Sequence, residues 1–255
     1  MSRTTRAVNV LMCSVAAAGA LCAVPAAAQN FPNRVVRVIN PNQPGGNSDV
    51  LFRLLSGRMS EALGQQVVVD YRPGAGGNIG AELSAKAPPD GYTTLIAAAS
   101  FLINPSVIKN LPFDATKDFT PLGLIVDIPA ALVTHPSLPV KSVKELIALA
   151  KARPADMFYS SSGTGAVGHL SGELFKGFIV SSGFSYLGPA GIAKPVVDKL
   201  NGALVHALRD PNNRKALIDR GANPIGSTPA EHGAYIKAEI EKWHKVAAQA
   251  GLTPK

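Results

Sequence analysis

The chain has 255 residues, of which 46% are hydrophobic and 16% charged, and its formal charge is +8. This length fits one large domain or two small ones, and it can bury a core without disulfides or metals. The hydrophobic fraction excludes a disordered chain, and the 24 glycines and 20 prolines are not periodic, which excludes a collagen-like fold. The positive residues are scattered singly, so nucleic acid is not an expected partner.

The first 28 residues have the pattern of a secretory signal peptide. Arg3 and Arg6 supply the positive start, an Ala-rich apolar run covers 7–24, and small residues precede Gln29 as in an A-x-A cleavage site. A retained membrane anchor is the alternative, because the apolar run reaches the length of a short membrane span. The A-x-A end favours removal, so we predict cleavage after Ala28 and a periplasmic location.

Metal and thiol chemistry are not expected after this segment. Both cysteines, Cys13 and Cys22, lie within it, so the remaining chain has no disulfide or thiol nucleophile. No pair among the five histidines has metal-ligand spacing, and neither a metal nor a cofactor is predicted. His169, beside a serine-rich loop, is the one histidine with a predicted functional role. The others are predicted to face solvent on helices: His135, His206, His232 and His244.

Strands and helices alternate through the first half of the chain. β-Branched and apolar runs predict strands at 35–39, 66–70 and 93–99. Apolar residues at helical spacing predict helices at 49–63, which ends at Gly64, and at 79–87, which ends at a Pro-Pro-Asp-Gly stretch. This order predicts a parallel sheet with helices packed on it.

The second half has the same alternation with weaker signals. Strand material is predicted within 125–134 and at 158–161, and a helix carries Leu170 and Leu174. Capping boxes at Ser142/Glu145 and Thr228/Glu231 open two helices, and Pro195 opens another that runs to about residue 208. In the last helix, Trp243 is predicted to pack in the core with Tyr235 and Ile240.

Three polar, Gly-rich loops follow predicted strands, at 41–48, 73–78 and 161–164. In open α/β sheets, ligands bind beyond the carboxyl ends of the strands. Glycines let a ligand approach the backbone, and helix N-termini present free N–H groups to an anion. None of the loops contains lysine, which favours holding an anion over transforming it. Ordinary strand-to-helix turns are the alternative. The candidate residues from these loops are Gly45, Gly46, Asn47, Ser48, Gly76, Gly77, Asn78, Ser161, Ser162, Gly163 and Thr164, to which we add Ser100 after the third strand.

Two stretches of the sequence resemble nucleotide-binding motifs but lack residues that those motifs require. The glycines at 74–80 resemble a dinucleotide fingerprint with one residue too many, and the acidic residue expected after the next strand is missing. The run at 163–168 has the spacing of a phosphate loop, but His169 and Leu170 replace the lysine and hydroxyl residue. No G-x-S-x-G elbow of a serine hydrolase is present.

The chain resembles the tripartite tricarboxylate transporter substrate-binding proteins, also called the Bug family of extracytoplasmic solute receptors. The run R-P-G-A-G-G-N-I-G at 72–80 is highly specific, and the likeness covers nearly the whole chain after residue 28. Other matching stretches are P-G-G-N-S-D at 44–49, P-D-G-Y-T at 89–93, L-P-F-D at 111–114, S-S-G-T-G at 161–165 and H-L-S-G-E-L-F-K at 169–176.

The resemblance implies an α/β fold of the periplasmic-binding-protein type II kind, with two lobes that close on a ligand. Lobe 1 would comprise 29–126 and 184–255, and lobe 2 would comprise 127–183. The implied function is capture of a small carboxylate by a monomeric, non-enzymatic receptor that delivers it to a membrane permease. The resemblance adds Asp49, as the family acid, and His169 to the candidate ligand-binding residues.

The sequence departs from the family after Lys176, where relatives continue through more of lobe 2 and this chain runs into Gly177. The missing piece would be on the order of 60 residues or more, which predicts a truncated second lobe. The pair Asn42-Gln43 also stands where the family usually has an aromatic residue or alanine. Two alternatives remain: a degenerate paralogue or gene-model artefact that binds nothing, and a secreted enzyme that uses 161–164 with His169, for which no third orienting group is evident.

Overall fold

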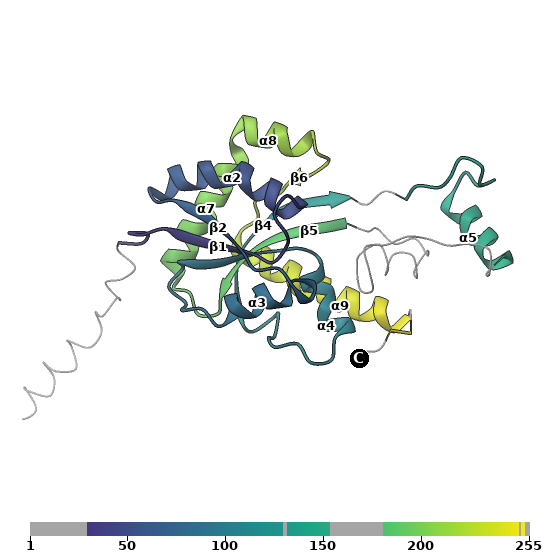
Figure 1. Ribbon diagram of the computed structural model, residues 1–255, viewed down its shortest axis with the longest axis horizontal. Coiled ribbons are helices and arrows are strands. Elements are labelled where there is room, and N and C mark those ends of the chain that lie inside the picture. Colours follow the sequence, from purple (N-terminus) through teal and green to yellow (C-terminus); the bar gives the residue numbers. More distant parts are fainter. Residues whose placement is uncertain (1–29, 130–131, 154–180, 250, 253–255) are drawn as a thin grey trace, which may run out of the picture.

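A computed structural model describes residues 30–129, 132–153, 181–249 and 251–252, and its centre is a six-stranded mixed sheet with helices on both faces (Figure 1). The strands are β1 (Val36–Asn40), β2 (Val67–Tyr71), β3 (Thr93–Ala97), β4 (Phe119–Pro129), β5 (Ser181–Pro189) and β6 (Asn223–Pro224). Their order across the sheet is β2-β1-β3-β5-β4-β6. The predicted strands at 35–39, 66–70 and 93–99 are therefore confirmed to within two residues.

The parallel sheet predicted from the first half of the chain is confirmed for its three strands, and the complete sheet is mixed. β1 pairs in parallel with β2 and with β3, but β5 is antiparallel to both of its neighbours, β3 and β4. A parallel pair requires a crossover connection, usually a helix that returns the chain to the starting edge. β4 instead runs out of the sheet and β5 runs back in beside it, so the two strands have opposite directions.

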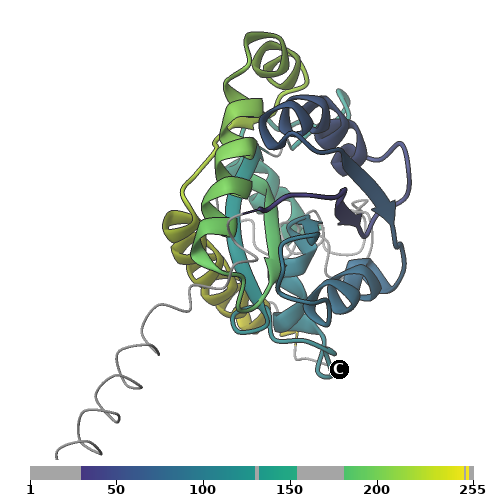
Figure 2. The same cartoon turned by 90° about the vertical axis from the view of Figure 1, so that its left-hand side faces the viewer.

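Helices cover the two faces of this sheet in two layers (Figures 1 and 2). The helices are α2 (Asn47–Leu63), α3 (Asn78–Ala85), α4 (Ser100–Val107), α5 (Val143–Ala152), α7 (Lys194–Arg209), α8 (Pro211–Ile218) and α9 (Pro229–Gln249), with a short 3-10 turn η3 (Ala75–Gly77). α2 and α7 lie on one face, and α3, α4 and α9 lie on the other, while α5 lies beyond the ends of β4 and β5 (Figure 1).

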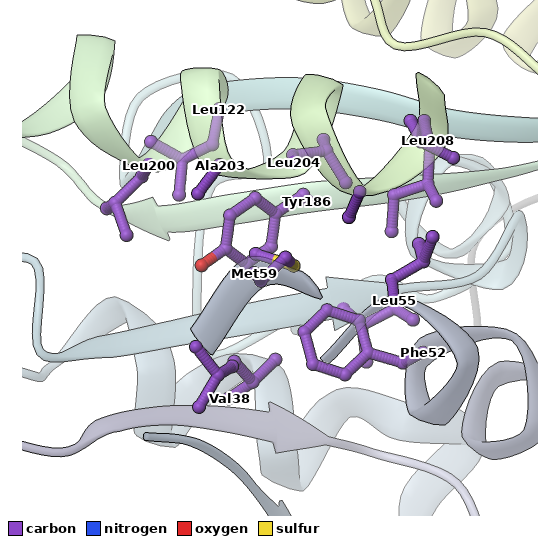
Figure 3. Packing of buried hydrophobic residues seen from close by; sticks show 14 of the residues in the cluster. Val38, Phe52, Leu55, Met59, Leu122, Tyr186, Leu200, Ala203, Leu204 and Leu208 are labelled. Carbon is purple, nitrogen blue, oxygen red and sulfur yellow. The ribbon is translucent and has the colours of Figure 1, made fainter. Parts of the chain in front are cut away.

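A first hydrophobic cluster lies between α2, α7 and the sheet (Figure 3). Phe52 and Leu55 of α2 and Leu200 and Leu204 of α7 surround Tyr186 of β5, and all five are fully buried. Each such side chain contributes about 1.5–3 kcal/mol when it leaves water. The Tyr186 hydroxyl accepts a hydrogen bond from Thr94 Oγ1 at 3.2 Å, so this buried polar atom has a hydrogen-bond partner.

The second cluster lies on the opposite face and contains Trp243, as predicted. Trp243 is buried, Tyr235 and Ile240 pack against the same cluster, and the indole Nε1 donates to Glu239 Oε2 at 3.1 Å. Three rings from α4, from the segment before β4 and from the start of β4 also pack there, with Phe101 and Phe113 stacked and Phe119 edge-on to both.

Both predicted capping boxes are confirmed. Ser142 Oγ accepts from the Glu145 N–H before α5, and Thr228 Oγ1 accepts from the Glu231 N–H before α9. Two helices were not predicted: α4, which contains Pro105, and α8, which is polar and is capped by the Asp210 carboxylate.

β4 and β5 form the longest strand pair, from Phe119 opposite Pro189 to Pro129 opposite Ser181. The pair passes the predicted lobe boundaries at 126 and 184, and the division into lobes stays a prediction. The predicted signal peptide, the strand at 158–161, the helix carrying Leu170, the loop at 161–164, His169 and the truncation after Lys176 lie outside the described residues.

His232 contradicts the expectation that it faces solvent. Its ring is fully buried where α9 meets β4 and β5. Nδ1 accepts from the Gly123 N–H at 3.1 Å, so the proton is on Nε2, which lies 2.9 Å from Ser185 Oγ. Burial lowers the pKa of His232 to about 3, so the ring is neutral at physiological pH. The core accommodates this ring because the Gly123 N–H of β4 donates a hydrogen bond to it. His206 and His244 are exposed on helices as predicted, and His135 is exposed in a turn rather than on a helix.

Candidate functional site

Three strand-to-helix connections meet at one edge of the sheet. β1, β2 and β3 are parallel, so their carboxyl ends lie at the same edge, and α2, α3 and α4 follow them in the chain. Ligands in open α/β sheets bind at such an edge. The described part of the predicted site is therefore assembled from the loops before these three helices.

The first loop leads into α2 without a side-chain cap. Gly46 is the N-cap in an extended conformation (φ −71°, ψ 168°), and no side chain caps the backbone N–H groups of the first turn. The backbone N–H groups of Asn47, Ser48 and Asp49 have no acceptor among the described residues. Free N–H groups at the positive end of a 17-residue helix are suited to an anion such as a carboxylate.

The second loop is a tight turn built from left-handed residues. Positive φ angles occur at Gly74 (134°), Ala75 (48°), Gly76 (66°) and Gly77 (96°), and Ala75 is the only non-glycine with positive φ in the described ranges. The Gly77 N–H donates to the Gly74 carbonyl at 2.9 Å, which closes the turn. Turns of this kind present successive N–H groups as an anion-binding concavity.

The two loops lie against each other through Pro41. A Cβ atom added at Gly80 would lie 2.8 Å from Pro41 Cβ, so only glycine fits at that position. A small cavity opens beside this contact, and it is lined by the predicted residues Gly76, Gly77, Asn78 and Ser100 together with neighbours that include Phe101.

A hydrogen bond between two asparagines fixes the third connection. Asn104 Nδ2 of α4 donates to Asn78 Oδ1 at 2.7 Å, and both side chains are buried. This bond orients the Asn78 carboxamide and leaves its Nδ2 without an acceptor in the part of the chain that the structure describes. Asn78 therefore presents a donor beside the glycine turn.

Asp49 stabilises the first loop from inside. Its carboxylate accepts from the Gly45 N–H at 2.7 Å, Arg53 Nε at 2.7 Å and the Tyr71 hydroxyl at 2.5 Å. Burial alone would raise the pKa of Asp49, but the bonds from Tyr71, Gly45 and Arg53 outweigh burial and hold the pKa below its ordinary value. The ionised carboxylate thus anchors Gly45, which has a φ of 81°, and Arg53 compensates its charge next to the free N–H groups.

The predicted site residues fall into three groups. Gly76, Gly77, Asn78 and Ser100 line the cavity, and Gly45 to Asp49 form the neighbouring corner at α2. The side chains of Ser48 and Asp49 are buried and bond within the protein, so these positions offer backbone N–H groups. The rest of the predicted set lies outside the described residues: Ser161, Ser162, Gly163, Thr164 and His169.

Sequence reasoning missed four residues that shape this edge: Asn40, Arg53, Tyr71 and Asn104. Only Arg53 had a usable local signal, because it follows Asp49 by four residues on one helix.

Two solved structures share this architecture. A structure of the periplasmic binding protein BugD matches with a TM-score of 0.76 and 26% identity, covering 88% of this chain and 100% of that chain. A structure of R. palustris Rpa4515 with adipate matches with a TM-score of 0.78 and 29% identity over the same shares. The fold is that of a periplasmic solute-binding protein, which confirms the predicted fold class.

Sequence comparison gives the family. Residues 51–177 match the family described as "Tripartite tricarboxylate transporter family receptor". Protein BugT of Bordetella pertussis is 34% identical over 267 residues, which cover 98% of this chain and 81% of BugT. A UPF0065 protein of Bordetella bronchiseptica is 42% identical over 152 residues, which cover 59% of this chain and 45% of that protein.

The chain therefore belongs to the tripartite tricarboxylate transporter receptor family, as the sequence motifs indicated. The family is one of transporter receptors, and BugD is a periplasmic binding protein, so the chain is a solute receptor and the enzyme alternative is wrong. Within the described residues, none of the helices is both long and apolar enough to cross a membrane.

Proposed function

We propose that the chain captures a small dicarboxylate in the periplasm and passes it to the membrane permease of a tripartite transporter. The observation that carries this proposal is the uncapped first turn of α2 beside the glycine turn at 74–77. Both features offer backbone N–H donors, and neither loop contains a lysine. Rpa4515, a relative by structure at 29% identity, was solved with adipate, which makes a linear dicarboxylate the first candidate.

Several further features complete the proposal. Residues 1–28 direct export and are removed after Ala28. Residues 29–126 and 184–255 form lobe 1, and residues 127–183 form a shortened lobe 2 that closes over the ligand with Ser161, Ser162, Gly163, Thr164 and His169. The receptor works as a monomer and needs no cofactor.

Binding of adipate is expected to raise the melting temperature of the protein that starts at Gln29. A ligand that binds only the folded state stabilises it by about 2.7 kcal/mol at a hundredfold excess over Kd. Differential scanning fluorimetry followed by titration calorimetry measures this effect. Adipamide, which has the same length without the charges, is the matched control and should produce no shift.

The screen also includes succinate, malate, citrate, amino acids and aromatic acids. A complete absence of shifts across this panel would contradict the proposal and favour the alternative of a degenerate receptor that binds nothing.

Replacing Gly76 with valine is expected to weaken binding of adipate, or of the panel acid with the largest shift, at least about tenfold. Valine in the left-handed conformation is strained by about 1–2 kcal/mol, so the turn must change shape and redirect its N–H groups. Gly221→Val is the matched control, because Gly221 has a similar φ of 74° with open space around it at the end of α8.

Both glycine variants should lose a similar amount of stability, and only Gly76→Val should lose affinity in calorimetry. Equal affinities in the two variants would show that the glycine turn is not part of the binding site.

A further inference from the structure

One buried donor at the α2 corner has no partner within the protein. Among the described residues, three buried polar side-chain atoms lack a hydrogen-bond partner: Asn40 Nδ2, Ser84 Oγ and Ser106 Oγ. Two are serine hydroxyls on the helices α3 and α4. The third belongs to Asn40, the last residue of β1, where the strand ends at the candidate site.

The orientation of the Asn40 carboxamide is determined by its oxygen. Oδ1 accepts from the Asn42 N–H at 3.1 Å and from Ser48 Oγ at 3.0 Å, and Ser48 Oγ in turn accepts from Asn42 Nδ2 at 3.1 Å. The reverse orientation would place an amide donor against the Asn42 N–H. Nδ2 is therefore the group left unpaired, and the side chain has no solvent-exposed surface.

An unpaired buried donor is costly. Leaving a buried polar group unsatisfied costs about 1–3 kcal/mol, and a ligand atom that accepts from Nδ2 would remove this cost. Asn40 is bonded to Ser48, which lies in the first turn of α2, so its Nδ2 belongs to the same corner as the free N–H groups of Asn47, Ser48 and Asp49. The corner therefore gathers several hydrogen-bond donors without acceptors among the residues that the structure describes, and such a set of donors suits an anionic oxygen.

We propose that Asn40 is a ligand-binding residue, and that its Nδ2 donates to a carboxylate oxygen held at the N-terminus of α2. This inference rests on the proposed function and extends it to a side chain that neither glycine loop contains. Because Nδ2 is buried, the oxygen that it binds enters the corner and leaves bulk water, where hydrogen bonds to charged groups are strong. Asp49 does not oppose this, since Arg53 and Tyr71 already bind its carboxylate.

The test compares Asn40→Leu and Asn40→Asp with the wild type by calorimetry, using adipate or the panel acid that gives the largest shift. Leucine keeps the volume and removes the donor, and we expect affinity to fall about 10- to 100-fold. Aspartate keeps an acceptor for Asn42 and Ser48 but replaces the donor with a charged oxygen. At pH 8 we expect the Asn40→Asp variant to bind the acid at least as weakly as Asn40→Leu does. As the pH falls and the new carboxyl is protonated, its affinity should approach that of the wild type measured at the same pH.

Because the ionised carboxyl of Asn40→Asp is buried and also destabilises the fold, melting curves at each pH separate recovery of binding from recovery of folding. A second readout is the side-chain amide signal of Asn40 in ¹⁵N NMR, identified by its loss in Asn40→Leu, which should shift on titration with the acid. Ser106→Ala is the matched control, because it removes another unpaired buried group away from the corner, and its affinity should stay within about twofold of the wild type.

The inference is overturned if the Asn40→Leu variant is folded, as judged by its melting curve, and its affinity lies within twofold of that of the wild type. It is also overturned if the Asn40 amide signal does not move at saturation with the acid. In that case a buried water would be the partner of Nδ2 and the proposed function would stand. Failure of the wild type to bind any acid in the panel would reject the proposed function and this inference together.

Discussion

Replacing His232 with leucine should lower the free energy of unfolding by about 2–4 kcal/mol at pH 7.5. The substitution leaves the Gly123 N–H and the Ser185 hydroxyl without their buried partner, and each unsatisfied group is destabilising. Urea denaturation measures the difference. His206→Leu is the matched control, because His206 is exposed on α7, and its effect should stay within about 0.5 kcal/mol.

The same histidine should make the wild type sensitive to acid. Its pKa is about 3 in the folded protein against an ordinary value of 6.5. Below pH 6.5 this histidine binds a proton in the unfolded chain but not in the folded protein. The free energy of unfolding therefore falls by about 1.4 kcal/mol for each pH unit of acidification. Between pH 6.5 and pH 4.5 the wild type should lose about 3 kcal/mol from this group.

The His232→Leu variant lacks this contribution, so its stability should change less over the same interval. Parallel pH profiles for wild type and variant would show that the ring is not held neutral by the fold.

Replacing Asp49 with alanine should reduce both stability and ligand affinity. The change removes the acceptor of the Gly45 N–H, the Tyr71 hydroxyl and Arg53 Nε, and we expect a loss of about 2–3 kcal/mol together with at least about tenfold weaker binding of adipate or the best panel acid. Because the folded pKa of Asp49 is lowered from 3.8, its contribution is present above that pH and disappears only as the pH falls through the folded pKa.

Asp198→Ala provides the comparison for Asp49. Asp198 pairs with Lys194 on α7, and both side chains are more than half exposed, so its loss should cost about 0.5 kcal/mol or less without affecting binding. If Asp49→Ala behaves like Asp198→Ala, the carboxylate does not hold the first loop in place. Asp49→Asn, which keeps an acceptor oxygen, should fall between the wild type and the alanine variant.

The parts of the fold that could be predicted have local signals. The β-branched run at 35–39 and the capping boxes at Ser142 and Thr228 contain their information within a few residues, and each is present in the structure. β5 could not be recognised, because its sequence S-S-G-F-S-Y-L-G-P has little strand preference. It is a strand because β3 and β4 bind it on both sides.

The candidate site divides in the same way. The glycine loops were visible because a positive φ favours glycine, and the helices that follow them have clear apolar periodicity. The bonds from Tyr71 to Asp49, from Ser48 to Asn40 and from Asn104 to Asn78 join residues 22, 8 and 26 positions apart. Such partners meet only after the sheet has formed, and no spacing rule identifies them.

The pairing of Pro129 with Ser181 has a consequence for how this protein can vary. The chain leaves the sheet after Pro129 and returns to it at Ser181, so the segment between these positions is attached to two adjacent strands. Its length can grow or shrink without moving any register in the rest of the sheet. Genetic exchange at these two positions would replace the segment between them and leave the six-stranded sheet unchanged. A sensor domain could be inserted into the protein at the same junction.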